Sequence, residues 1–170
     1  MPGSVGVFDL TTPGHLYAKL SRELGRMRAT LTDVDHAFNF FVTAEHLPDW
    51  IHPGDDKDSK LARRAIRHGR ALTRIVSHLA TGAKHFDPRG EQHESVIGSG
   101  AVHSIMPVPE FVFMDRPVFV VDLAGREADN IGLQPWETRI EALRLAEQVY
   151  LFWGKRLGME GQVTDVRPIL

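Results

Sequence analysis

The chain has 170 residues, of which 42% are hydrophobic and 25% are charged, and its formal net charge is −2 with histidine neutral. These values are typical of one globular domain, and they exclude wholesale disorder and a strong overall basic field. The absence of cysteine excludes disulfides and thiolate chemistry. The N-terminal segment MPGSVGVFDL lacks the basic start and apolar run of a signal peptide, and no run approaches the roughly 20 apolar residues of a membrane span. We therefore expect a cytoplasmic protein that does not enter a membrane.

Hydrophobic spacing predicts two helices in the first third of the chain. Thr12 can cap a helix and Pro13 fits its first turn, so we expect the first helix over about residues 13–30. The second is expected over about 33–51. Pro48 should kink or end it, because proline has no N–H to donate to the preceding turn.

A third, long helix is predicted over about 56–85, with a strongly basic first half. The region 95–131 is rich in glycine, proline and β-branched residues and predicts two to four antiparallel strands, with turns at 115–117 and 124–126. A last helix is expected over about 137–157. The sequence therefore predicts a single α+β, mainly α domain over 1–170: a four-helix bundle with a small antiparallel β region inserted before the last helix.

The segment from His36 to Trp50, HAFNFFVTAEHLPDW, is the most informative part of the chain. A helix that is apolar nearly all round is normally buried. Four polar residues recur at i, i+3, i+7 and i+10 and share one stripe: His36, Asn39, Thr43 and His46. Because buried polar groups need partners, this stripe predicts a polar site inside a helical domain. We expect the large aromatic side chains to be core: Phe38, Phe40, Phe41, Trp50 and Trp153.

A second stripe is predicted on the end of the third helix, in RIVSHLATGAKHF. Its members are Ala71, Ile75, His78, Gly82 and His85. The small residues would let a neighbouring helix or a ligand come close to the two histidines. A short loop joins the second and third helices, so they should be antiparallel. That arrangement brings His78 and His85 nearer to His36 and Asn39 than to His46.

The phrases HAFNFFVTAEHLPDW and SHLATGAKHF resemble those of a family of bacterial and phage proteins, which carries FNFFVTAxHLxDW and, later, ANGxKHF. A strand region and an aromatic phrase at Leu151–Trp153 follow in the same order, so the resemblance covers about 12–153. This sequence has Thr81 where the family usually has asparagine. No activity is assigned to that family, so the resemblance implies the order of elements and little about function.

The segment Ala80–His85 is also similar in spacing to the signature of the HEPN superfamily of helical bundles, in which an arginine and a polar residue precede a histidine late in a helix. Many HEPN proteins are metal-free ribonucleases or nucleotide-binding modules of toxin–antitoxin and phage-defence systems. The resemblance implies an RNA- or nucleotide-handling module with three catalytic residues: His85 as general acid–base, Lys84 on phosphate, and His46 as a second acid–base or orienting group. Ala80 replaces the signature arginine, so Lys84 or Arg74 would have to supply the cation.

Under this interpretation the basic helix would steer the polyanion. The remaining polar residues of the two stripes, together with Asp49, would bind the ligand: His36, Asn39, Thr43, Asp49 and His78.

Two other functions stay open. A histidine metal site in the bundle is one, with four candidate ligands: His36, His46, His78 and His85. No H-E-x-x-H or Glu-x-x-His pair supports it. The other is a non-catalytic structural or interaction protein, in which the stripe is a satisfied buried network. An exposed apolar patch or a homodimer would favour that function. The sequence identifies no cofactor.

Overall fold

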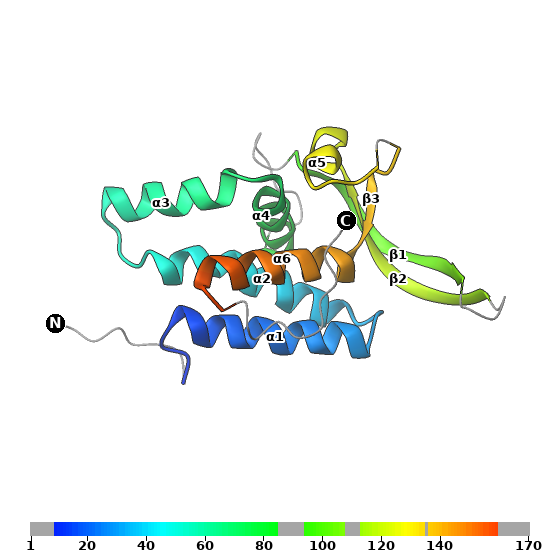
Figure 1. The fold of residues 1–170 in the computed structure, drawn as a ribbon, viewed down its shortest axis with the longest axis horizontal. Helices are drawn as coiled ribbons and strands as arrows, with labels where there is room; N and C mark the ends of the chain where they lie inside the picture. The colour runs from blue at the N-terminus through cyan, green and yellow to red at the C-terminus, as the bar shows by residue number, and fades with distance from the viewer. Residues whose placement is uncertain (1–8, 85–93, 108–112, 135, 160–170) are drawn as a thin grey trace.

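The computed structural model describes residues 9–84, 94–107, 113–134 and 136–159 (Figure 1). Its elements in chain order are α1 (Pro13–Ala29), α2 (Val34–Ile51), α3 (Lys57–His68), α4 (Ala71–Lys84), β1 (Val96–Pro107), β2 (Phe113–Leu123), α5 (Gly125–Asn130), β3 (Arg139–Glu141) and α6 (Ala142–Leu157). The predicted α+β, mainly α fold is confirmed, and a three-stranded antiparallel sheet lies before the last helix.

The first two helices begin where the sequence predicts, because each start is fixed by a local cap. The side chain of Thr12 accepts a hydrogen bond of 3.2 Å from the N–H of His15. The carboxylate of Asp33 accepts one of 2.9 Å from the N–H of Asp35. Pro48 lies inside α2, which continues to Ile51.

The prediction of one long helix over 56–85 was wrong. The chain forms α3 and α4 instead, and Gly69 caps the end of α3. The backbone passes so close to itself there that a Cβ atom on Gly69 would lie 2.5 Å from the carbonyl oxygen of Ala65. The change of direction at this glycine lets α4 bury Ile75 and Val76 in the core. The sequence did not predict the break, because apolar residues recur at helical spacing both before and after Gly69.

The sheet has the strand order β1-β2-β3, with antiparallel pairing throughout. Ala101 lies opposite Phe119, and Val121 lies opposite Ile140. The strand order makes β1 an edge strand of the described sheet. The register shifts between Val96 and Gly98, which indicates a bulge near the start of β1.

Three predictions around the sheet were also wrong. Residues 115–117 were expected to form a turn, but they lie inside β2 and pair with β1. Residues 124–126 were expected to form a turn, but α5 begins at Gly125. The last helix begins at Ala142 rather than near 137, because Arg139–Glu141 pairs with β2 as β3. This pairing buries Ile140, which is 2% exposed, in the core.

The core is built mainly by α1, α2, α4 and α6, with Val121, Leu123 and Ile140 added from the sheet. The rings of Tyr17 and Tyr150 stack at 4.6 Å and join α1 to α6. Figure 1 shows α1, α2 and α6 along the long axis and α4 nearly end-on, so α4 crosses the other three. In the ranges given above, no helix is long and apolar enough to cross a membrane.

Candidate functional site

An open groove lies between the first half of α2, the second half of α4 and the strands β1 and β2. Its volume is about 530 Å³, which falls within the roughly 300–1,000 Å³ of ligand sites in proteins. Apolar side chains supply most of its walls, among them Val34, Phe38, Phe41, Leu79, Val96 and Phe119. Its polar side chains, among the residues that the structure describes, are those of His78 and Ser99.

The wall formed by α2 is apolar and open to solvent. Phe40 and Phe41 are buried in the core, whereas Phe38 is 45% exposed and Val34 is 60% exposed. The prediction that Phe38 belongs to the core was therefore wrong. The reason is that α2 is apolar on more of its circumference than its neighbours cover. The uncovered part faces the groove.

The opposite wall is formed by α4 and β1, and the side chain of His78 connects these two elements. The backbone N–H of Val96 donates a hydrogen bond of 3.1 Å to Nδ1 of His78. Five consecutive residues of β1, Val96–Gly100, line the groove. Since Gly98 and Gly100 carry no side chain beyond hydrogen, the main chain of β1 itself borders the groove at these two positions.

The second predicted stripe is divided between the core and this groove. Ala71 and Ile75 are buried, while His78 and Gly82 line the groove. His78 lines the groove together with Val34 and Phe38 from the first half of α2. The antiparallel arrangement predicted for these helices is not found for α4, which crosses α2 (Figure 1).

The stripe on α2 does not form the buried polar site that the sequence predicts. Thr43 is buried and its hydroxyl accepts a hydrogen bond of 2.6 Å from Lys19 Nζ. Asn39 is exposed. His36 and His46 are half-buried and each lies beside an aspartate: His36 Nε2 is 3.3 Å from Asp33 Oδ2, and His46 Nδ1 is 3.7 Å from Asp49 Oδ2.

An ion network ties α2 to α3, and sequence reasoning missed it. Arg67 Nε lies 2.5 Å from Glu45 Oε1, and Arg67 Nη2 lies 2.6 Å from Asp49 Oδ2. Arg63 Nε lies 3.2 Å from Asp49 Oδ1. A signal existed in the sequence: the two acids are four residues apart on one helix, and the two arginines are four apart on the next.

Burial dominates the electrostatics of Glu45. Desolvation raises the pKa of its carboxyl group above the ordinary value, against the opposing effect of Arg67. Burial would lower the pKa of Arg67, but hydrogen bonds to Asp49 and Glu45 raise it instead. The network thus keeps Arg67 charged while making the ionisation of Glu45 costly.

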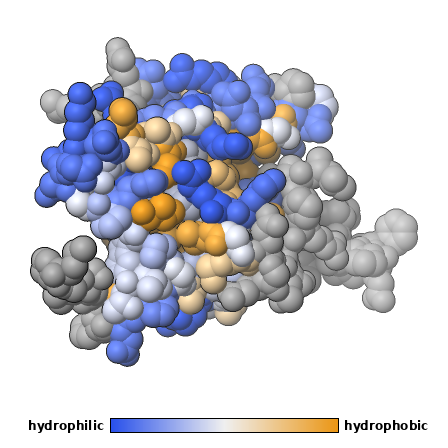
Figure 2. Space-filling view, turned by 60° about the vertical axis from the view of Figure 1, so that its left-hand side comes forward, coloured by the Kyte–Doolittle hydropathy of each residue, from blue (hydrophilic) through white to orange (hydrophobic). Residues whose placement is uncertain are grey.

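The same network occupies part of the basic surface expected to attract a polyanion. Arg63 and Arg67 face carboxylates of α2, and Lys60 Nζ lies 3.7 Å from Asp55 Oδ1. Figure 2 shows wide hydrophilic areas with smaller hydrophobic ones between them on the side turned forward. Nucleic-acid steering by this helix stays a prediction.

The structure does not test the arrangement of the residues predicted for RNA chemistry, which are His46, Lys84 and His85. His85 lies outside the described residues, and Lys84 is the last residue of α4. Ala80, at the position of the HEPN arginine, is 1% exposed. Arg74 forms an ion pair with Glu127, in which Nη2 lies 2.8 Å from Oε2. The ribonuclease centre stays a prediction.

The metal site also stays a prediction. Within the described ranges, no group of three or more His, Cys, Asp or Glu side chains could hold a metal ion. Of the four candidate ligands, His85 lies outside these ranges. His36, His46 and His78 occupy three different surroundings, as given above.

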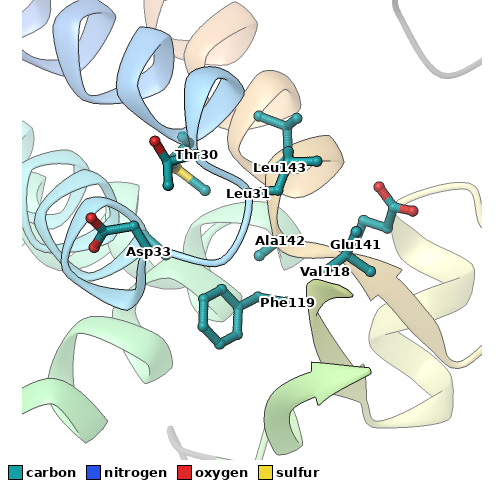
Figure 3. Close-up of a pocket in the computed structure, with 10 residues that line it drawn as sticks. Thr30, Leu31, Asp33, Val118, Phe119, Glu141, Ala142 and Leu143 are labelled. Carbon is teal, nitrogen blue, oxygen red and sulfur yellow. The ribbon is translucent and has the colours of Figure 1, made fainter. Parts of the chain in front are cut away.

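A second hollow lies where the turn between α1 and α2 meets β2, β3 and the start of α6 (Figure 3). Its volume is about 10 Å³, close to the minimum that one water molecule needs. The carboxylates of Asp33 and Glu141 point to opposite sides in Figure 3, so they do not form an acid–base pair. This hollow is a packing gap rather than a ligand site.

Comparison with known proteins finds no family model that matches the chain, and no curated protein or solved structure that matches it. The two family resemblances seen in the sequence therefore stay predictions. The function has to be argued from the geometry of the groove.

Proposed function

We propose that this protein is a non-catalytic interaction protein, which binds an apolar segment of a partner protein in the groove between α2, α4 and β1. The observation that carries the proposal is the exposure of Phe38 and Val34 on the wall of a groove whose lining is mostly apolar. Removing apolar surface from water is favourable by about 25 cal/mol per Å². Contiguous exposed apolar surface is typical of interaction sites.

The chemistry of the lining favours binding over catalysis. No Asp, Glu, Lys or Arg is among the described residues that line the groove. A phosphate-bearing ligand such as RNA needs cations, and general acid–base catalysis needs a positioned proton donor or acceptor. His78 is the titratable side chain in the lining, and its Nδ1 already accepts the hydrogen bond from Val96.

The proposal is tested by selecting peptides from a phage-displayed library of random 12-residue sequences on the immobilised protein. The groove is then filled by Gly82→Leu. Gly82 is exposed, and a Cβ atom there meets no other atom within 4 Å. Leucine is also better than glycine in a helix by about 0.8–1 kcal/mol, so this variant keeps the fold. Gly25→Leu on α1, equally exposed and open, is the matched control.

We expect selected peptides to be rich in apolar residues and to bind Gly82→Leu about tenfold more weakly than the parent protein. Gly25→Leu should bind them as the parent does. The proposal is overturned if no peptide is enriched, or if enriched peptides bind Gly82→Leu as tightly as the control. RNA binding that depends on His85, in the absence of peptide binding, would favour the RNA-handling function instead.

A further inference from the structure

The main chain of β1 offers more than a boundary to the groove. In the described sheet, β1 is paired on one side with β2 and has no strand on its other side. The N–H of Val96 donates to His78 on α4, so it points away from β2 and along the groove side. The N–H of Val96 is thus hydrogen-bonded to α4. From Val96 the strand continues along the groove to Gly100.

Beyond the bulge near its start and the contact with α4 at Val96, this edge lacks the charged side chains and the internal proline that normally prevent strand pairing. Natural edge strands carry charged side chains, particularly lysine, or an interrupting proline. The 12 residues of β1, VIGSGAVHSIMP, include no Lys, Arg, Asp or Glu, and the proline is the last residue. Side-chain bulk is also small where the groove is open, since a Cβ atom on Gly100 would meet no atom within 4 Å.

The nature of the edge selects the occupant. A small apolar molecule or a helix seated in the groove would cover backbone N–H and C=O groups without giving them hydrogen bonds, which is costly. An extended peptide supplies matching groups and projects alternate side chains toward the same wall. The apolar side chains of Phe38 on α2 and Leu79 on α4 are in position to receive them.

We propose that the partner segment is an extended, apolar peptide that adds to the outer edge of β1 as a further strand. Alternate side chains of the peptide pack between α2 and α4, and its main chain bonds to β1. This inference rests on the proposed function, since it names the conformation and the recognition mode of the segment that the groove binds.

The test uses the peptides selected on the full chain. We expect apolar residues at alternate positions (i, i+2, i+4) rather than at helical spacing. In a scan by isothermal titration calorimetry, N-methylation of single peptide bonds should lower affinity about tenfold at every second position and leave the intervening positions unchanged. Ser99→Lys places a charge on the exposed edge and should weaken binding. Ser21→Lys, equally exposed on α1, should not.

The outcomes separate the two proposals. Peptides that are weakened by Gly82→Leu but show helical spacing, or no alternation in the N-methyl scan, keep the proposed function and overturn strand addition. Enrichment of no peptide overturns both. A dimer in sedimentation that Ser99→Lys dissociates, with no peptide bound by the parent protein, would also overturn the inference, because the occupant would be a second copy of the chain.

Discussion

His78 on α4 and Val96 on β1 are joined by a hydrogen bond of 3.1 Å, in which the backbone N–H of Val96 donates to Nδ1 of the ring. The two residues are 18 positions apart in the chain. Because Nδ1 is the acceptor, the neutral ring carries its proton on Nε2. The bond holds the start of the edge strand against the helix and so fixes the two walls of the groove relative to each other.

Replacement of this histidine tests the contact directly. His78→Ala removes the ring nitrogen that accepts the hydrogen bond from the N–H of Val96. We expect the free energy of unfolding to fall by about 1 kcal/mol, as for the loss of one hydrogen bond. Urea denaturation measures the change, and hydrogen exchange should show faster exchange of the Val96 amide.

His52→Ala serves as the control for this substitution. The carbonyl oxygen of His52 accepts a hydrogen bond from Arg63, and alanine retains this carbonyl group. The free energy of unfolding should change by less than about 0.5 kcal/mol. Equal losses in the two histidine variants, with unchanged exchange at Val96, would contradict a specific role for His78.

Local chemistry made part of the fold predictable. Thr12 and Asp33 cap helices through residues three or two positions away, so the sequence alone locates both starts. The break at Gly69 depends on where α4 packs after it, and no local signal distinguishes this glycine from Gly25 or Gly82, which lie inside helices. For the same reason β3 was missed: three residues form a strand only because Val121 is there to pair with Ile140.

Loss of Arg67 should be among the most damaging changes on α3. Arg67→Ala leaves the carboxylate of Glu45, which is 15% exposed, without its nearest cation. We expect the free energy of unfolding to fall by about 2 kcal/mol or more, because a charged group loses its partner in a partly desolvated site. Urea denaturation at neutral pH gives the value. Glu45→Gln in the same background should recover part of the loss, since the uncompensated charge is then removed.

Lys60→Ala is the control for the arginine variant. Lys60 and Asp55 form an ion pair with side chains 59% and 97% exposed, and water screens such a pair. The change should stay within about 0.5 kcal/mol. A similar effect of the two substitutions would show that the network around Arg67 contributes no more than a surface ion pair.

The raised pKa of Glu45 predicts a pH dependence with a definite sign. Since burial raises the pKa of the folded carboxyl above its ordinary value of 4.5, the folded state holds the proton more tightly than the unfolded state does. The stability associated with this group is therefore fully present below pH 4.5 and is lost as pH rises through the folded pKa. The free energy of unfolding of the parent protein should fall relative to that of Glu45→Gln over this window. Urea titrations of both proteins at a series of pH values measure the difference between their free energies of unfolding. If the parent protein instead became more stable relative to Glu45→Gln as the pH rises, the raised pKa of Glu45 would be refuted.

The candidate site was only partly visible in the sequence. The spacing of His78 and Gly82 indicated a surface on α4 with room beside it, and both residues line the groove. The prediction for Phe38 was wrong because hydropathy indicates only that burial of a side chain is favourable. It does not indicate whether another element of the fold packs over that side chain. The edge of β1 could not be identified either, since strand order is set by pairing between distant segments.

Two glycine substitutions should change stability in opposite directions. At Gly69 a Cβ atom would lie 2.5 Å from the carbonyl oxygen of Ala65, and backbone cannot move aside as a flexible side chain can. At Gly25, inside α1, a Cβ atom meets nothing within 4 Å. Gly69→Ala should therefore lower the free energy of unfolding by about 1–3 kcal/mol, because the turn between α3 and α4 has to open.

Gly25→Ala should raise the free energy of unfolding by about 0.4–1 kcal/mol, since alanine restricts the unfolded chain and favours the helix. Thermal and urea denaturation of the two variants measure whether each substitution raises or lowers the free energy of unfolding. If Gly69→Ala were as stabilising as Gly25→Ala, the close approach to Ala65 would not be what requires glycine at this position. The division into α3 and α4 would then have to come from the burial of Ile75 and Val76 alone.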